Sequence, residues 1–159
     1  MKYTVGFVFS KNLKFVYLIR KNRPAWQQDL LNGIGGKVEA DESFLECMIR
    51  EAKEESGYEG AWTLFAELLY PDDVVQYFYS VANYGVVPVT IGAENIVIVC
   101  MENINLMHCV PNVRWLVPAA VVHMTDNYKF MLTGKQQAGG ECALCSSDLS
   151  KFKETALRR

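Results

Sequence analysis

The chain has 159 residues, half of them hydrophobic and 12% aromatic, with a formal net charge of −2, so it can form one domain with a substantial core. The lack of a long basic tract argues against a nucleic-acid polymer as its partner. We expect a soluble, cytoplasmic protein, because no apolar run approaches the ~18 residues of a membrane-spanning helix and the N-terminus lacks a signal-peptide pattern.

The five cysteines are an odd number in a chain without a secretory signal, which predicts reduced thiols. Cys142 and Cys145 form a lone CxxC pair. A structural zinc ion needs four ligands, and no other cysteine or histidine stands at a recognisable finger spacing. We therefore expect incidental thiols here, with zinc binding or redox chemistry as the alternatives.

The N-terminal third begins with two β-rich segments, residues 3–9 and 14–20, which predict a hairpin. Residues 21–30 contain Pro24 and polar residues and should form a loop. Its basic residues, including Arg23, either lie at a solvated strand end or face substrate phosphates. Residues 31–37 contain three glycines, which permit tight turns and a close approach of main-chain donors to a ligand.

A helix is predicted between Ser43 and Gly57. Ser43 and Glu46 form a capping-box pattern at its start, and glycine commonly follows a helix end. At about 100° per residue, one stripe of this helix should pack against the core; its members are Leu45, Met48, Ile49 and Ala52.

Three carboxylates, Glu51, Glu54 and Glu55, share the edge of that stripe. Like charges at this spacing repel, and a hard divalent cation such as Mg²⁺ would remove the repulsion. Arg50, four residues before Glu54, can pair with it and fix its rotamer. The alternative is an ordinary solvated acidic face.

Strands are predicted at residues 61–70 and 74–82, joined by a turn at residues 71–73. Weak alternation in residues 76–80 indicates a strand covered on both faces. Residues 83–95 should be irregular, 96–101 a short buried strand, 103–111 a loop, 113–117 the last strand, and 118–124 a helix that begins with Pro118. Residues 134–140 should form a linker, and residues 149–157 have the apolar spacing of a helix that could dock on the sheet or on a second subunit of a homodimer.

The stretch from Gly36 to Tyr58 matches every fixed position of the Nudix box, G-x5-E-x7-R-E-U-x-E-E-x-G-U, where U is bulky or apolar. The chain thus resembles the Nudix hydrolase family. The resemblance implies an α+β fold, with a mixed sheet between the box helix and a C-terminal helix, in one domain spanning residues 1–159. Residues 31–37 resemble the W-N-G-F-G-G-K segment of MutT-like members, with Leu31 and Ile34 in place of the two aromatics.

The resemblance also implies a site for a small-molecule nucleotide. Metal ligands for Mg²⁺ or Mn²⁺ would be Glu51, Glu54 and Glu55, and the catalytic residues Glu51, Glu54 and Arg50. Asn32 would contact the base, Glu42 would support the ligands, and the other substrate-binding positions would be Arg23, Gly35, Gly36 and Lys37. Glu51 is one candidate general base, and Glu94, Glu102 and His108 are others.

The implied reaction is hydrolysis of a nucleoside diphosphate linked to a group X. The favoured substrates are canonical or oxidised (d)NTPs, cleaved to the monophosphate and pyrophosphate. ADP-ribose or a nucleotide sugar is the alternative within the same enzyme class. A Nudix module that senses nucleotide without turnover is the alternative outside it, although such modules are expected to carry damaged boxes.

Overall fold

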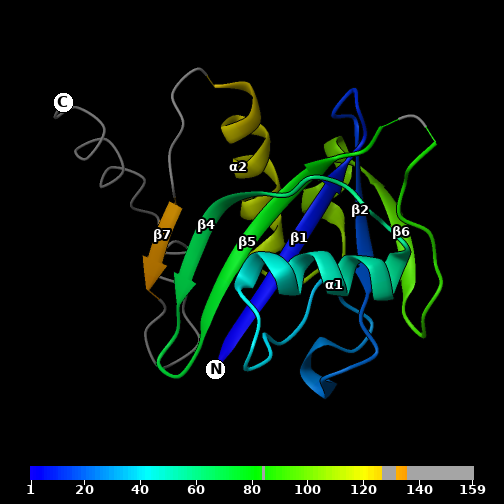
Figure 1. The fold of residues 1–159 in the computed structure, drawn as a ribbon. Helices are drawn as coiled ribbons and strands as arrows, with labels where there is room; N and C mark the ends of the chain where they lie inside the picture. Colours follow the sequence, from blue (N-terminus) through cyan, green and yellow to red (C-terminus); the bar gives the residue numbers. More distant parts are fainter. Residues whose placement is uncertain (84, 127–131, 136–159) are drawn as a thin grey trace, which may run out of the picture.

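The computed structural model describes residues 1–83, 85–126 and 132–135 as an α+β fold, in which one mixed sheet lies between two helices (Figure 1). Seven strands form the sheet: β1 Lys2–Phe9, β2 Phe15–Arg20, β3 Leu31–Asn32, β4 Thr63–Leu69, β5 Val74–Val81, β6 Asn95–Cys100 and β7 Leu132–Lys135. The strand order is β3-β2-β1-β5-β4-β7, and β6 pairs with the other edge of β2. β1 is parallel to β5, and β4 is parallel to β7, while the other pairs are antiparallel.

Two apolar cores cover the two faces of the sheet, as the alternation of side chains along β1 requires. Phe7 and Phe9 pack into the core that includes Leu116 of helix α2, Val113–Thr125. Val8, between them, packs into the core that includes Met48 of helix α1, Phe44–Ser56. β5 is buried on both faces, which confirms the prediction for residues 76–80.

The predicted hairpin is present, but β1 and β2 diverge below its turn. They pair only at Val8 and Phe9. The rest of this edge of β1 bonds to the glycine-rich segment instead: the Gly6 N–H donates to the Ile34 carbonyl (2.7 Å) and the Thr4 N–H to the Gly36 carbonyl (3.0 Å). The glycine loop is therefore fixed to the first strand.

The predicted strand at residues 113–117 is wrong, because this segment forms the first half of α2. Val113, Leu116, Val117 and Ala120 are buried at the spacing of one helix face, which overrides the β propensity of valine. Pro118 lies inside the helix and does not begin it.

Two other predictions of burial are partly wrong. In α1, Met48 and Ala52 are buried as expected, but Leu45 is 43% and Ile49 48% exposed. The helix is rotated so that Cys47 faces the core in their place. In β6, Val99 is buried, whereas Ile98, which points to the opposite face of the strand, is 61% exposed.

Residues 83–94 form an irregular segment, of which residue 84 is not described, and Asn95 already belongs to β6. The loop predicted at residues 103–111 overlaps the 3-10 helix η2, Met101–Leu106. Gly134 and Lys135 belong to β7, contrary to the predicted linker. The predicted helix at 149–157 and the Cys142–Cys145 pair lie outside the described residues. No helix in the described part of the chain is long and apolar enough to cross a membrane.

Candidate functional site

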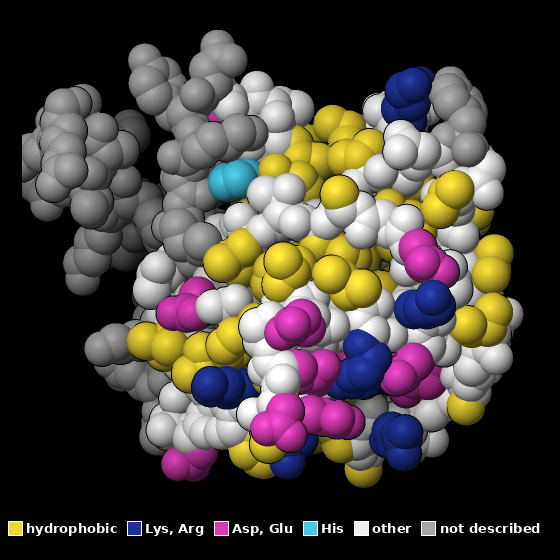
Figure 2. Space-filling view, viewed as in Figure 1, with side chains coloured by type: hydrophobic (Ala, Val, Ile, Leu, Met, Phe, Trp, Pro, Cys, Tyr) yellow, Lys and Arg dark blue, Asp and Glu magenta, His cyan; other side chains and the backbone are white. Residues whose placement is uncertain are grey.

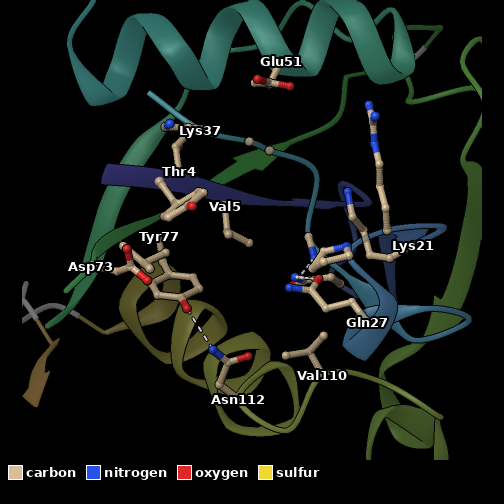
Figure 3. A pocket seen from close by; sticks show the side chains of 18 of the residues that line it. Thr4, Val5, Lys21, Gln27, Lys37, Glu51, Asp73, Tyr77, Val110 and Asn112 are labelled. Atoms are coloured by element: carbon tan, nitrogen blue, oxygen red, sulfur yellow. Dashed lines mark hydrogen bonds between the residues drawn. The ribbon is translucent and has the colours of Figure 1, made fainter. Parts of the chain in front are cut away.

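A cavity of about 720 Å³ opens where β1 and β2 diverge. Its volume is in the range of small-molecule sites. Figure 3 shows Glu51 of α1 on one side, Asn112 and Val110 on the opposite side, and Thr4 and Val5 of β1 between them. Lys21 and Gln27, from the loop after β2, lie across the cavity from Tyr77 and Asp73. Segments distant in sequence thus form one site.

The box helix has the predicted ends. The Ser43 side chain accepts a hydrogen bond from the Glu46 N–H, and the Glu46 carboxylate accepts one from the Ser43 N–H. Gly57 adopts the left-handed conformation (φ 63°) that ends the helix. Both signals are local in sequence, and they set where the carboxylates of α1 stand.

Arg50 lies at the centre of a carboxylate network. Its guanidinium group contacts Glu42 (2.7 Å), Glu51 (2.9 Å) and Glu54 (3.1 Å), which confirms the expected Arg50–Glu54 pair. Hydrogen bonds from Arg50 and from the Glu39 N–H lower the pKa of Glu42 to about 2. Neither Arg50 nor Glu42 lines the cavity. They hold Glu51, which does line it.

Two glycines bring the loop against β1 and α1. Gly35 has φ +148°, and a methyl group there would overlap the main-chain carbonyl of Thr4. A methyl group on Gly36 would overlap the carboxylate of Glu51. Gly35 also donates its N–H to the Glu55 carboxylate (3.0 Å). The absence of side chains at these positions therefore permits the contact between loop and helix.

Glu55 and Glu94 both face Lys21. The ammonium nitrogen of Lys21 lies 2.6 Å from Glu94 Oε2 and 3.7 Å from Glu55 Oε1. Glu94, from the irregular segment before β6, also accepts the Asn22 N–H (2.7 Å). Burial raises the pKa of Glu55 to about 7, against the opposing effects of Lys21 and the Gly35 N–H. Of the two acids proposed from outside the box, Glu94 therefore lies at the site, whereas no described contact brings Glu102 there.

The residues fit a divalent metal ion in part. Glu51 and Glu55 line the cavity and offer the oxygen ligands that Mg²⁺ prefers. A cation would also offset the cost of burying the charge of Glu55. Glu54 is 61% exposed, pairs with Arg50 and does not line the cavity. Among the described residues, no three acidic, histidine or cysteine side chains converge as a complete ligand set. The arrangement suits a cation held by one or two carboxylates and by the phosphates of a ligand.

The predicted substrate-binding residues Arg23, Asn32, Gly35, Gly36 and Lys37 all line the cavity. The Asn32 side chain is already engaged: its amide nitrogen donates to Gln27 Oε1 (3.1 Å), and its oxygen accepts the Gly33 N–H (2.8 Å). Asn32 thus joins two parts of the cavity wall.

Asn112, just before α2, is a cavity residue that sequence reasoning missed. Its amide nitrogen donates to the hydroxyl of Tyr77 (2.8 Å), as Figure 3 shows. Its buried Oδ1 has no hydrogen-bond partner among the described residues. A helix start at residue 113 would have identified Asn112 as a cap position, but the sequence predicts a strand there.

The front face of the molecule shows how charge is distributed around α1. Figure 2 shows acidic and basic side chains gathered on the lower half of this view, with hydrophobic side chains above them. The ion pairs of Arg50, Lys21 and Lys53 account for much of this mixture. The acids of the box are therefore part of a locally compensated surface.

Comparisons with known proteins agree with this fold and identify its family. The NUDIX domain model matches residues 2–131. A search of curated proteins found no match. A solved structure from a study of MutT from Aliivibrio salmonicida and Vibrio cholerae is similar, with a TM-score of 0.63 and 20% identity, over 78% of this chain and 99% of that one.

Two further solved structures share the fold. The MutT protein from Bacillus halodurans has a TM-score of 0.64 and 18% identity, over 84% of this chain and 87% of that one. The NUDIX domain of Shewanella oneidensis NrtR, complexed with ADP ribose, has a TM-score of 0.67 and 13% identity, over 79% and 88%. With the family match over most of its length and a cavity built around an intact box, the chain belongs to the NUDIX domain family.

Proposed function

We propose that the protein is a Mg²⁺-dependent pyrophosphohydrolase that cleaves a nucleoside diphosphate linked to a group X, with (d)NTPs as its main substrates. One observation supports this most: within a single cavity that lysine and arginine side chains also line, the box carboxylate Glu51 stands opposite the amide of Asn112 (Figure 3). A nucleotide combines phosphates, which carboxylate-bound metal and cations can hold, with a ring that an amide can recognise.

The phosphate end contains the residues that would bind metal and charge. Glu51 and Glu55 from the cavity wall, with the exposed Glu54 of the same helix, would hold Mg²⁺, and Mn²⁺ could replace it. When bound, the ion would neutralise phosphate charge and orient the attacking water. Lys21, Arg23 and Lys37 line the same cavity and would contact the phosphate oxygens.

Arg50 would act by holding Glu51 in one rotamer, because it binds both Glu51 and its neighbour Glu54. The proton of the attacking water would pass to Glu51 or Glu55 at the cavity wall. Without metal, burial raises the pKa of Glu55 to about 7; a bound cation would lower it and favour the carboxylate form that serves as a ligand. Water adds to one phosphorus atom, and the bridging P–O bond of the anhydride breaks.

The other end of the cavity would bind the nucleobase. Tyr77 and Val110 offer apolar surface, and the buried Oδ1 of Asn112 lacks a donor among the described residues. Leaving a buried acceptor unpaired costs about 1–3 kcal/mol, so a ring N–H or amino group there would be favoured. ADP-ribose shares its adenine and its diphosphate with ATP and could occupy the same cavity. The experiment below distinguishes it from (d)NTPs.

The test separates and quantifies by chromatography the products formed from NTPs, dNTPs, oxidised dGTP, ADP-ribose and dinucleoside polyphosphates, with Mg²⁺ or with EDTA. A (d)NTP would give the monophosphate and pyrophosphate, ADP-ribose would give AMP and ribose 5-phosphate, and a dinucleoside polyphosphate would give two nucleotides. We expect metal-dependent turnover, highest with a (d)NTP. Glu51→Gln and Glu54→Gln should each lower kcat by at least about a hundredfold, because electrostatic groups of this kind typically contribute that much. Glu59→Gln is the matched control, since Glu59 is exposed and, among the described residues, forms an ion pair with the exposed Lys53 alone.

Turnover that survives Glu51→Gln and Glu54→Gln would contradict the assignment of these ligands. ADP-ribose as the best substrate would replace the (d)NTP assignment and keep the chemistry. Binding of nucleotides without any turnover would identify a sensor module.

A further inference from the structure

Trp26 lies on the rim of the cavity and is 65% exposed. It belongs to the 3-10 turn η1, Ala25–Gln27, which has no buried residue. Exposing most of a tryptophan forgoes the large apolar burial that this side chain usually provides. Something other than core packing therefore has to explain its position.

The loop that carries Trp26 has a well-defined backbone. Lys21 donates its N–H to the Leu30 carbonyl (2.9 Å) and accepts the Asp29 N–H (2.8 Å), which closes the loop at its base. The Gln27 N–H bonds to the Pro24 carbonyl (2.8 Å), and the Gln27 side chain bonds to Asn32 on β3. Trp26 is thus presented from a hydrogen-bonded turn.

The surroundings of Trp26 favour a small ligand over a protein partner. Its exposed neighbours are mixed, since Arg23 and Gln28 are polar and Pro24 and Ala25 are apolar. Arg23 lines the same cavity and would bind an anionic group. A planar ring beside phosphates is what such a pair of residues recognises.

The geometry across the cavity indicates which part of the ligand Trp26 contacts. Gln27, adjacent to Trp26, stands opposite Tyr77, with Val110 between them at the end of the cavity (Figure 3). A ring seated against Asn112 already has Tyr77 on one side. Trp26, which is adjacent to Gln27 and also lines the cavity, would cover the other side.

We propose that Trp26 is a stacking residue for the nucleobase and determines whether the protein distinguishes nucleotides from base-free polyphosphates. This inference rests on the proposed function, because it needs a nucleotide in the cavity. Every base has a π face, so stacking on Trp26 tolerates different bases, and Asn112 remains free to discriminate among them.

The test measures binding to the intact protein by calorimetry. The probes are α,β-methylene ATP and α,β-methylene GTP, which resist cleavage between the α and β phosphates, and inorganic tripolyphosphate, which has no base. Trp26→Ala should weaken both nucleotides by about tenfold or more, as expected for loss of one stacked base, and leave tripolyphosphate within about twofold. Trp26→Phe, which retains a ring, should restore most of the affinity.

The control variant is Trp62→Phe, since Trp62 packs edge-on against Tyr58 (5.7 Å between ring centroids) and does not line the cavity. It should bind all three probes like the wild type. Nucleotides should also quench wild-type tryptophan fluorescence, and tripolyphosphate should not.

Equal weakening of all three probes by Trp26→Ala, or no weakening at all, would overturn the proposal, as would a wild type that binds neither nucleotide. If the tryptophan fluorescence lost in Trp26→Ala changed with protein concentration and did not change with nucleotide, Trp26 would belong to an interface between copies of the protein. If the wild type turned over no member of the substrate panel but still bound nucleotides in a way that depends on Trp26, only the proposed hydrolysis would be overturned.

Discussion

At the residue scale, stability and function place opposite requirements on the partly buried side chain of Glu55: stability favours a neutral group there, and the site needs a carboxylate. Its charged form is disfavoured by burial, and Lys21 and the Gly35 N–H compensate only in part. A residue selected for stability would be neutral there. The carboxylate is retained at a cost, as is common where a site needs a ligand or a base.

The cost of Glu55 predicts a pH dependence of stability. Since the pKa rises from 4.5 in the unfolded chain to about 7 in the fold, the folded protein binds this proton more tightly, and the free energy of unfolding should fall as pH rises from 4.5 to 7. Glu55→Gln should remove that fall. At pH 8 and without metal, it should be more stable than the wild type by up to about 3 kcal/mol, at 1.36 kcal/mol per pKa unit.

Urea unfolding in EDTA at several pH values between 4.5 and 8 measures this difference, with Glu59→Gln as control. The curves of wild type and Glu55→Gln should converge towards pH 4.5. A constant offset between them would show that Glu55 is not titrating in this window.

At the scale of elements, the glycine loop depends on two glycines for different reasons. A side chain at Gly35 would meet the backbone of β1, which cannot move without breaking the sheet, and φ +148° is strained for any other residue. A side chain at Gly36 would meet only the end of Glu51. The first glycine therefore supports the fold, and the second supports the site.

Alanine at each position should separate these roles. Gly35→Ala should lower the free energy of unfolding by about 2 kcal/mol or more, because backbone strain and overlap add. Gly36→Ala should leave stability within about 1 kcal/mol, since the carboxylate end of a flexible glutamate can shift, and should lower kcat through the displaced Glu51. Thermal unfolding and turnover of the two variants, measured in parallel, provide the check. The same stability loss in both would contradict the distinction.

At the scale of the whole molecule, the sheet separates two cores with different relations to the site. Met48 lies under β1, where Thr4 donates its hydroxyl to the Met48 sulfur (3.3 Å), and α1 carries the carboxylates. Leu116, which belongs to α2, is buried against the opposite face. Loss of packing on the two faces should therefore affect activity differently.

Met48→Ala and Leu116→Ala should each lower the free energy of unfolding by about 2–5 kcal/mol, the usual cost of a cavity in a core. At a temperature where both variants remain folded, Met48→Ala should also reduce kcat, because α1 and its carboxylates shift. Leu116→Ala should retain kcat near the wild-type value. Equal kcat values in the two variants would show that the position of α1 does not depend on its core.

Local signals in the sequence predict the fold of the box well. Ser43 and Glu46 begin α1, and Gly57 ends it, because capping depends on residues within one turn. The exposed Leu45 and Ile49 could not be predicted from the apolar stripe, because the rotation of α1 also has to bring Glu51 and Glu55 to the cavity. The family resemblance supplied the mixed sheet, and the structure confirms it.

The base end of the cavity was beyond local reasoning. Tyr77 and Asn112 are far apart in the sequence and meet only because α2 packs against β5. Because a strand was predicted at residues 113–117, the start of α2 at Val113 was missed, and with it the position of Asn112 at the N-terminus of this helix. Lys21 and Glu94 are joined in the same way by the β2–β6 pairing.

The divergence of β1 and β2 also determines whether residues 36–58 could form the same site in another protein. Residues 36–58 are contiguous in sequence, yet the position of Gly36 depends on a main-chain bond from Thr4, and Gly35 has room only because of the local path of β1. A graft of this 23-residue segment onto another scaffold would reproduce the helix and its acids without the strand that seats the loop. The structural unit that forms this site is thus a pair of segments, and the first strand belongs to it as much as residues 36–58 do.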